Sequence, residues 1–311
     1  NAFDHEWAAD VQVGGDDEPH DIYIIAGGVY GQAHRVEGHE YGHEPEHEHR
    51  DNAQASHSPH HGGETTPENF NEHLDLLRSR CDCLSLSDLL RRCREGRATG
   101  REATITFDDG YRDQAAAARR AMAKGVHATI FIPSSYPESG RNFFWEGRDS
   151  EECERIKDQM RRGMEPPEGL ETSDVMSWAE IAGLVKEGIG IESHAHSHRI
   201  LSGLPDPELK TELLAARREF EAHLDRRPEV IAYPNGDWND FDARVDRSVD
   251  EAGFAAGVTA VFGAVRRAQL PWRIRRLGVA NQSAESLEQV LRGGHAAAAC
   301  KAALDHWRGR R

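Results

Sequence analysis

Short runs of β-branched and aromatic residues that alternate with helical segments constrain the fold of this chain more than any other feature. The runs lie at residues 22–26, 103–107, 127–132, 189–193, 230–233, 255–259 and 274–279. Between them apolar residues recur at helical spacing, as Phe70, Leu74 and Leu77 do. Repeated alternation of strands and helices predicts a parallel sheet with helices packed against it. Alternation alone fits both a barrel and a doubly wound sheet.

Local capping signals mark where helices begin. Thr66 followed by Pro67 predicts a helix start, because threonine is a good N-cap and proline fits the first helical turn. Ser177 and Glu180 form a capping box that opens another helix. We therefore divide the chain at the first of these helices, into an N-terminal segment of residues 1–66 and a main domain of residues 67–311.

The N-terminal segment is acidic and rich in glycine and histidine. We expect it to be partly loop and to pack on the main domain. Its histidines crowd into one stretch, at His34, His39, His43, His47, His49, His57, His60 and His61. Such a tract can serve as an auxiliary metal-binding segment. A long polar loop is the simpler interpretation, and we favour it.

Composition excludes several classes of function. The net charge of −16 argues against a nucleic-acid groove. A mean hydropathy of −0.71, with no apolar run near twenty residues, excludes a membrane span. The five cysteines include no Cys-x-x-Cys pair, so we expect mostly free thiols and favour a cytoplasmic location. Because the chain begins at Asn1 rather than methionine, removal of an upstream segment, with an envelope or secreted location, is the alternative.

Two adjacent carboxylates follow the run at 103–107. Asp108 and Asp109 precede Gly110, where the strand is expected to end. Neighbouring side chains on a strand point to opposite faces, but past the strand end both can turn toward one mouth. Two acids placed there can divide the work, one holding a metal and the other handling a proton. Asp-Asp-Gly is also an ordinary turn sequence, so this motif alone leaves both interpretations open.

A histidine cluster follows the run at 189–193. His194 and His198 are four residues apart, so a helical turn after Ser193 would place both imidazoles on one face. Imidazole and carboxylate together suit a divalent metal such as zinc. The alternative is a polar loop that happens to contain histidines. Both this cluster and the acid pair stand where α/β folds place their chemistry, at the carboxyl ends of strands, which favours a shared metal site.

These motifs resemble those of the polysaccharide deacetylases of carbohydrate esterase family four, the NodB-homology group. The first family motif stands here at residues 106–110 as Thr-Phe-Asp-Asp-Gly, the second at 194–198 as His-Ala-His-Ser-His, and the third at 233–236 as Tyr-Pro-Asn-Gly. The likeness covers roughly two thirds of the chain. It implies a distorted, incomplete (β/α)7 barrel of the NodB type, with residues 67–311 as the catalytic domain.

The resemblance also implies a metal-dependent hydrolase. Asp109, His194 and His198 are the expected metal ligands, and Zn2+ is the expected ion. Bound zinc lowers the pKa of water from ~15.7 toward ~7, which makes a nucleophile at neutral pH. Asp108 is the implied general base that takes a proton from this water. The charge of the adjacent metal would hold Asp108 ionised.

Four residues are expected to contact the substrate: Tyr111, Tyr233, Asn235 and Trp238. By likeness to the family, a backbone N–H near Tyr111 or Asn235 would stabilise the tetrahedral oxyanion together with the metal. Trp238 stands next to the Pro-Asn-Gly loop and is a candidate for stacking on a sugar ring. For Trp178, core packing is the preferred interpretation.

Three features depart from the family pattern. Where many members have Arg-x-Pro-Tyr, the arginine is replaced by Ala232, so Arg276 is nominated to supply the orienting charge from another strand, with a surface cation as the alternative. The C-terminal Leu-x-His that supplies a general acid is missing, and His34 is nominated instead, with a loop histidine of no role as the alternative. Ala195 replaces the usual serine or threonine of the second motif, which puts the loop geometry in doubt.

The expected function is hydrolytic removal of an acetyl or similar small acyl group from an N-acylated amino sugar in a glycan. The expected partner is that glycan or amino-sugar substrate, and the sequence leaves the oligomeric state open. One alternative is an O-acetyl polysaccharide esterase with the same fold. The other is a catalytically silent protein that binds metal or glycan. The intact Asp108, Asp109, His194 and His198 argue against silence.

Overall fold

The computed structural model describes residues 23–27, 65–265, 271–279 and 281–292. His34 and the rest of the histidine-rich tract lie outside them. Within the described ranges, no helix has the length and apolar character needed to cross a membrane.

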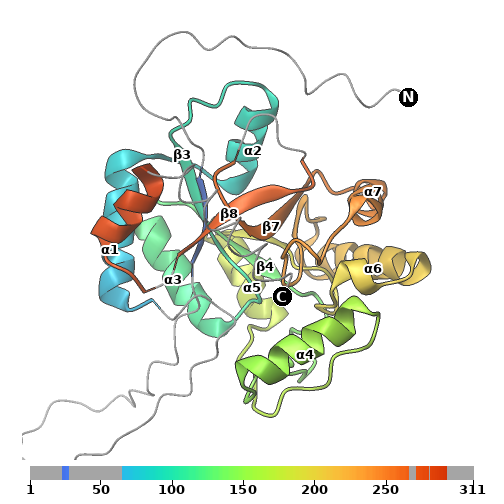
Figure 1. The fold of residues 1–311 in the computed structure, drawn as a ribbon. Helices are drawn as coiled ribbons and strands as arrows, with labels where there is room; N and C mark the ends of the chain where they lie inside the picture. The colour runs from blue at the N-terminus through green and yellow to red at the C-terminus, as the bar shows by residue number, and fades with distance from the viewer. Residues whose placement is uncertain (1–22, 28–64, 266–270, 280, 293–311) are drawn as a thin grey trace, which may run out of the picture.

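A ring of parallel strands forms the centre of the molecule (Figure 1). Seven of the eight strands close this ring, because β1 pairs with β8 on one side and with β3 on the other. The (β/α)7 barrel predicted from the sequence is thereby confirmed. The ring strands are β1 (Tyr23–Gly27), β3 (Glu102–Phe107), β4 (Ala128–Ile132), β5 (Gly190–Ser193), β6 (Val230–Ala232), β7 (Ala256–Phe262) and β8 (Ile274–Val279).

Two details of the ring differ from an ideal barrel. The short strand β2 (Asp82–Cys83) pairs with the start of β3, which the sequence did not predict. Strands β5 and β6 share a single register pair, Ser193 with Ile231, so the pairing between neighbouring ring strands is shortest there. Strand β1 belongs to the N-terminal segment of residues 1–66, and this part of that segment is built into the sheet.

Helices cover the outside of the ring, with α1 and α3 on one side and α6 and α7 on the opposite side (Figure 1). The helices are α1 (Pro67–Arg80), α2 (Leu86–Arg94), α3 (Arg112–Ala123), α4 (Ser150–Arg161), α5 (Trp178–Lys186), η1 (Leu201–Gly203), α6 (Asp206–Leu224) and α7 (Ala243–Glu251). Residues 284–292 are also helical, as expected from the sequence for the tail that begins at Ala284.

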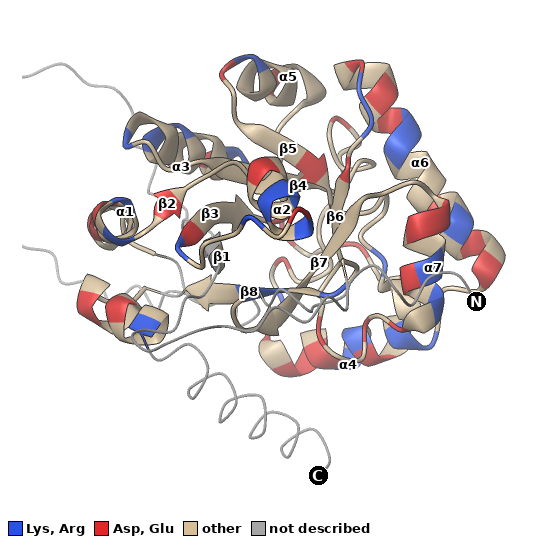
Figure 2. Ribbon diagram, turned by 90° about the horizontal axis from the view of Figure 1, so that it is seen from above, with Lys and Arg blue, Asp and Glu red and all other residues tan. Residues whose placement is uncertain are grey.

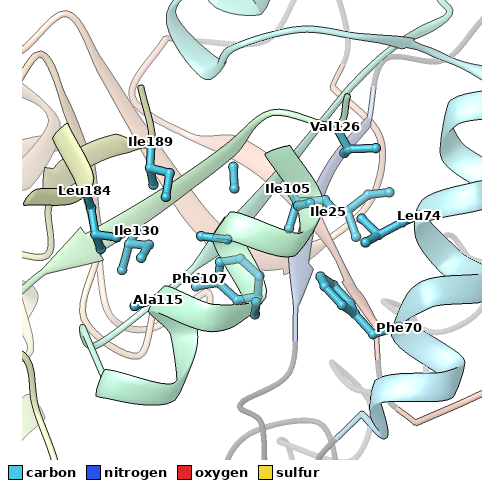
Figure 3. Close-up of a cluster of buried hydrophobic side chains, with 14 of the residues drawn as sticks. Ile25, Phe70, Leu74, Ile105, Phe107, Ala115, Val126, Ile130, Leu184 and Ile189 are labelled. Atoms are coloured by element: carbon cyan, nitrogen blue, oxygen red, sulfur yellow. The ribbon is translucent and has the colours of Figure 1, made fainter. Parts of the chain in front are cut away.

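Alternation along β3 separates the outer core from the barrel interior. Ala103, Ile105 and Phe107 pack against α1 and α3, where Phe70 and Leu74 lie close to them (Figure 3). The intervening side chains therefore face the interior of the barrel. This parity continues to Asp108, which is why its carboxylate is directed into the mouth of the barrel rather than toward the helices.

Helix α2 closes the amino-terminal end of the barrel. Its residues Leu86, Leu89 and Leu90 belong to one buried cluster with Val230 and Ala256. Val230 is the first residue of β6, and Ala256 is the first residue of β7. Seen from above, α2 lies over the middle of the ring (Figure 2). The carboxyl ends of the strands consequently form the open end, where the motif residues stand.

The predicted helix caps are present. Thr66 accepts a hydrogen bond from the backbone N–H of Asn69 at 3.3 Å, and α1 begins at Pro67. Ser177 and Glu180 form the predicted capping box, because Ser177 Oγ accepts from Glu180 N at 3.3 Å and Glu180 Oε2 accepts from Ser177 N at 2.8 Å.

Replacing Ser177 with alanine is expected to lower the free energy of unfolding by about 1 kcal/mol, because one amide at the start of α5 loses its acceptor. Urea denaturation of the two proteins measures this difference. Ser79→Ala is the matched control, since Ser79 is exposed in the last turn of α1 and caps no helix start. Equal losses in the two variants would show that the capping box adds nothing specific.

Candidate metal and catalytic site

Three buried side chains meet at the carboxyl ends of β3 and β5. Oδ1 of Asp109 lies 3.4 Å from Nε2 of His194 and 3.1 Å from Nε2 of His198. One ligand atom from each residue lies within 4.8 Å of the others. The structure thus brings together the three residues that the sequence singled out, and this group can hold a divalent metal ion.

The chain after β5 is not helical, so the helical turn considered for His194 and His198 is wrong. The loop instead folds back through left-handed backbone conformations at Ala195 (φ 62°) and His198 (φ 58°). Asp109 has a positive φ as well, 78°. Such conformations cost about 1 kcal/mol or more at a residue other than glycine, and they persist only where neighbouring contacts hold them.

The end of β4 holds one side of this loop. The backbone N–H of His194 donates to Ile132 O at 2.8 Å, and Ser135 N donates to His196 O at 2.9 Å. Nδ1 of His196 is 2.9 Å from Ser134 Oγ. His196 therefore turns away from Asp109 and is not part of the candidate metal group.

Glu212 of α6 holds the other side of the loop and was missed in the sequence. Its Oε1 accepts from His196 N at 2.9 Å and from Ser197 N at 2.5 Å, and its Oε2 accepts from Ser197 Oγ at 2.8 Å. A signal was available, because Glu212 stands on the same helical face as the buried residues Leu209, Leu213 and Ala216. An acid within an apolar stripe needs a buried partner.

The donor set fits a zinc-like ion on chemical grounds. Zinc ligands at tetrahedral positions lie roughly 3.3 Å apart, given bond lengths of about 2.0–2.1 Å. The separations of 3.4 and 3.1 Å from Asp109 match this spacing. Nδ1 of His194 is 2.8 Å from the carbonyl oxygen of Ala232, which accepts its hydrogen and leaves Nε2 as the nitrogen that can bind a metal.

Acidic neighbours control the protonation of His194. Burial alone lowers its pKa, but the hydrogen bond to Asp109 and the negative charges of Asp108 and Asp109 outweigh burial and raise the pKa overall. Without a cation, the site therefore favours a proton on His194. A divalent cation would neutralise the same carboxylates, so metal binding would be coupled to release of this proton.

Asp108 forms a two-pronged ion pair with Arg276 of β8. Nη1 and Nη2 of Arg276 each lie 2.7 Å from one carboxylate oxygen of Asp108. Nε of Arg276 donates to Thr259 O at 2.8 Å, which fixes the guanidinium plane. The Arg276 side chain is only 2% exposed, so the surface-cation alternative is wrong, and the predicted charge from another strand is present.

This ion pair keeps Asp108 ionised. Burial raises the pKa of Asp108, but the charge of Arg276 and its hydrogen bonds outweigh burial, and the pKa is lowered overall. The Asp108 side chain remains 24% exposed, in contrast to the buried guanidinium. An ionised carboxylate with one accessible face can accept a proton from a group placed in the mouth of the barrel.

An aromatic wall packs beside His198. The rings of Trp145 and Phe143 lie 5.0 and 5.4 Å from its imidazole, centroid to centroid, and meet it edge-on. Nε1 of Trp145 donates to the Tyr111 hydroxyl at 2.9 Å, and that hydroxyl donates to Glu146 at 2.5 Å. Tyr111 is therefore fixed at the site by the long connection between β4 and α5.

The third motif forms a braced loop after β6. Asn235 has a left-handed backbone (φ 61°), and its side chain donates to Asp240. Asp240 is fully buried and also accepts from Asp237 N at 2.8 Å and from Nε of Arg161 in α4 at 2.8 Å. The loop that presents Asn235 is thereby anchored to α4.

The tryptophans and Tyr233 occupy different environments. Trp238 is 49% exposed, with the Arg275 guanidinium 5.2 Å from its ring centroid, so its ring is accessible to a ligand. Trp178 is buried against Phe220, as preferred from the sequence. Tyr233 is 1% exposed and packs in the cluster under α6 and α7. This placement contradicts the predicted substrate contact of Tyr233.

A family model described as polysaccharide deacetylase matches residues 95–256, more than half of the chain. The chain belongs to the polysaccharide deacetylase family. The match spans all three motifs, and so includes Asp108, Asp109, His194, His198 and Asn235.

Among curated proteins, this member of the family matches YxkH of Bacillus subtilis (strain 168), provisionally described as a polysaccharide deacetylase. The two are 27% identical over 176 residues, which cover 56% of this chain and 50% of YxkH. The chain thus spans about half the length of this curated relative.

Solved structures share the fold at low sequence identity. The deacetylase PplD of Streptococcus pyogenes, in complex with acetate, has a TM-score of 0.60 and 15% identity, covering 87% of this chain and 98% of PplD. The BpsB deacetylase domain of Bordetella bronchiseptica has a TM-score of 0.57 and 15% identity, covering 85% and 97%. A de-N-acetylase of Aggregatibacter actinomycetemcomitans has a TM-score of 0.56 and 12% identity, covering 87% and 98%.

Proposed function

We propose that this polysaccharide deacetylase family member removes an acetyl or similar small acyl group from an N-acylated amino sugar in a glycan, with a divalent metal held by Asp109, His194 and His198. The observation that carries the proposal is that two adjacent carboxylates lie in different environments. Asp109 lies buried between two imidazoles, whereas the adjacent Asp108 pairs with Arg276 and keeps an accessible face.

The metal, which we take to be Zn2+, would supply Lewis-acid polarisation of the acyl carbonyl and activation of water at neutral pH. Asp108 accepts a proton in this scheme, because Arg276 keeps its carboxylate ionised and oriented. Nδ1 of His194, bonded to Ala232 O, fixes the imidazole plane that faces Asp109. Backbone N–H groups near Tyr111 or Asn235 are the proposed donors to the developing oxyanion.

The substrate-facing residues remain a proposal. Trp238, with its exposed ring, is assigned to stack on a sugar ring of the glycan. Asn235 and Tyr111 lie on braced segments beside the candidate site, so their polar groups are held in place before a ligand arrives. His34 is assigned as the proton donor to the amine leaving group, and it lies outside the described residues.

The choice of an N-acyl rather than an O-acyl bond is supported by the related structures. The Aggregatibacter protein with the same fold is a de-N-acetylase by its description. PplD is described as a deacetylase in complex with acetate, the acid that removal of an acetyl group would release. We therefore propose an amide of acetate as the bond that this chain cleaves.

Release of acetate from N-acetylglucosamine oligomers tests the proposal. Metal-stripped protein is expected to be inactive, and added zinc is expected to restore release. The reason is that the proposed mechanism relies on the metal to polarise the acyl carbonyl and to activate water. Acetylated xylan, assayed in parallel, is the control for ester cleavage. Release from xylan alone would replace the proposal with an O-acetyl esterase. Binding of zinc without release from either substrate would favour a silent binding protein.

A further inference from the structure

The carboxylate of Glu212 in α6 is directed entirely at the loop that carries His194 and His198. All three hydrogen bonds that it accepts within the described residues come from His196 N, Ser197 N and Ser197 Oγ. Glu212 and Ser197 are both buried, so removal of the carboxylate would leave the two Ser197 donors buried without an acceptor.

The geometry of the loop explains why such an acceptor is needed. Two non-glycine residues with left-handed backbone, Ala195 and His198, flank the two amides that Glu212 holds. Neither lies in a helix or a strand, so regular hydrogen bonding does not fix their dihedral angles. The end of β4 holds residues 194–196 from the other side, but among the hydrogen bonds described above only Glu212 reaches Ser197.

The chain also lacks a local alternative at this position. Ala195 occupies the place where the family usually has a serine or threonine, so no hydroxyl at that residue can bond within the loop. The hydroxyl of Ser193 accepts from Ala195 N at 3.2 Å, which braces the start of the loop only. Its later half, which leads directly into His198, is held by α6.

We propose that Glu212 is a positioning residue that sets the separation of His194 and His198 and thereby the affinity of their metal site. The proposal rests on the metal site of the proposed function. Glu212 is not a member of the group of potential metal ligands. It acts by fixing the backbone between the two imidazoles, so that both Nε2 atoms stay within reach of Asp109.

Zinc affinity of the folded protein, measured by titration against a competing chelator, tests this role. Glu212→Met keeps the length of the side chain and removes both acceptors, and it is expected to weaken zinc binding about 10- to 100-fold. Glu221→Met is the matched control. It makes the same change on the same helix, at a glutamate that is half-exposed and pairs with Arg227 on the surface. Its zinc affinity is expected to equal that of the wild type.

Two conservative variants separate position from charge. Glu212→Gln keeps an acceptor at the same reach but loses the charge, whereas Glu212→Asp keeps the charge but retracts it by one methylene group. A positioning role predicts tighter zinc binding for Glu212→Gln than for Glu212→Asp. The reverse order would show that the charge matters rather than the contact, and would overturn the proposal. This pair decides the matter even if Glu212→Met does not fold.

Activity separates this proposal from the proposed function. Excess zinc is expected to restore acetate release in Glu212→Met, because its three ligands are intact, but not in Asp109→Ala. Unchanged zinc affinity in Glu212→Met would overturn the positioning role while leaving the deacetylase proposal standing. Weakened zinc binding in a protein whose wild type releases no acetate would support the positioning role and remove the proposed function.

Discussion

Replacing Asp108 with asparagine is expected to slow acetate release about 1,000-fold, within the range that general bases contribute, while leaving zinc affinity near the wild-type value. The reason is a division of labour between neighbours. Asp109 lies within the group of potential metal ligands, whereas Asp108 pairs with Arg276 and is not part of that group. Asparagine keeps the shape of the side chain but cannot accept the proton. Initial rates and zinc titration, run on the same preparations, measure the two quantities.

Asp174→Asn is the matched control for this experiment. Asp174 makes a surface ion pair with Arg112, so the same chemical change there should leave the rate unchanged. Thermal unfolding of Asp108→Asn should accompany the rates, because the buried Arg276 guanidinium loses its anionic partner. A variant that is folded and binds zinc but retains wild-type activity would remove Asp108 from the mechanism.

The order of strands and helices was predictable because each element carries its own local signal. Strands buried on both faces read as continuous β-branched runs, and β3 (Glu102–Phe107) is buried along its whole length. Thr66 and Ser177 mark their helices through side-chain caps that are visible as residue types. By contrast, β2 (Asp82–Cys83) is two residues long and exists only because the start of β3 is beside it.

The ligand set was predictable, but the path between the ligands was not. Helical spacing and a folded-back loop both bring residues i and i+4 together, so the sequence alone could not distinguish them. The deciding feature is the left-handed backbone at Ala195 and His198, and neither residue type predicts that conformation. The contact from Glu212 that holds this loop is separated from it by more than a dozen residues and depends on how α6 docks.

Strand parity would have corrected one substrate contact. Val230 and Ala232 belong to the cluster inside the barrel, whereas Ile231 and Tyr233 belong to the cluster under α6 and α7. Alternation along β6 thus continues one residue past its end and turns Tyr233 outward. Motif likeness named the residue as a contact, but the period of two along the strand decides its direction. The same rule directs Asp108 inward.

Replacing Arg276 with methionine is expected to slow acetate release about 10- to 100-fold and to reduce the free energy of unfolding by roughly 2–4 kcal/mol at neutral pH. Removing one partner of a buried ion pair leaves the other uncompensated, but Asp108 is 24% exposed, so water relieves part of the penalty. Arg276→Lys keeps the charge without the two-pronged fork and should show smaller losses of both rate and stability.

The pH dependence gives this prediction its sharpest form. Arg276 lowers the pKa of Asp108 below its value in the unfolded chain. The stabilisation from this pair is therefore complete above the unfolded pKa, about 3.9, and is lost as the pH falls through the folded pKa. The stability difference between wild type and Arg276→Met should accordingly shrink in acid.

The pH dependence of the rate should change as well. Without Arg276 the pKa of Asp108 rises, because burial is no longer opposed by the guanidinium charge. Since the ionised form is the base, the acidic limb of the pH–rate profile should move to higher pH in Arg276→Met, and less in Arg276→Lys. An acidic limb that stays in place in both variants would mean that a group other than Asp108 controls it, and Arg276 would then serve stability alone.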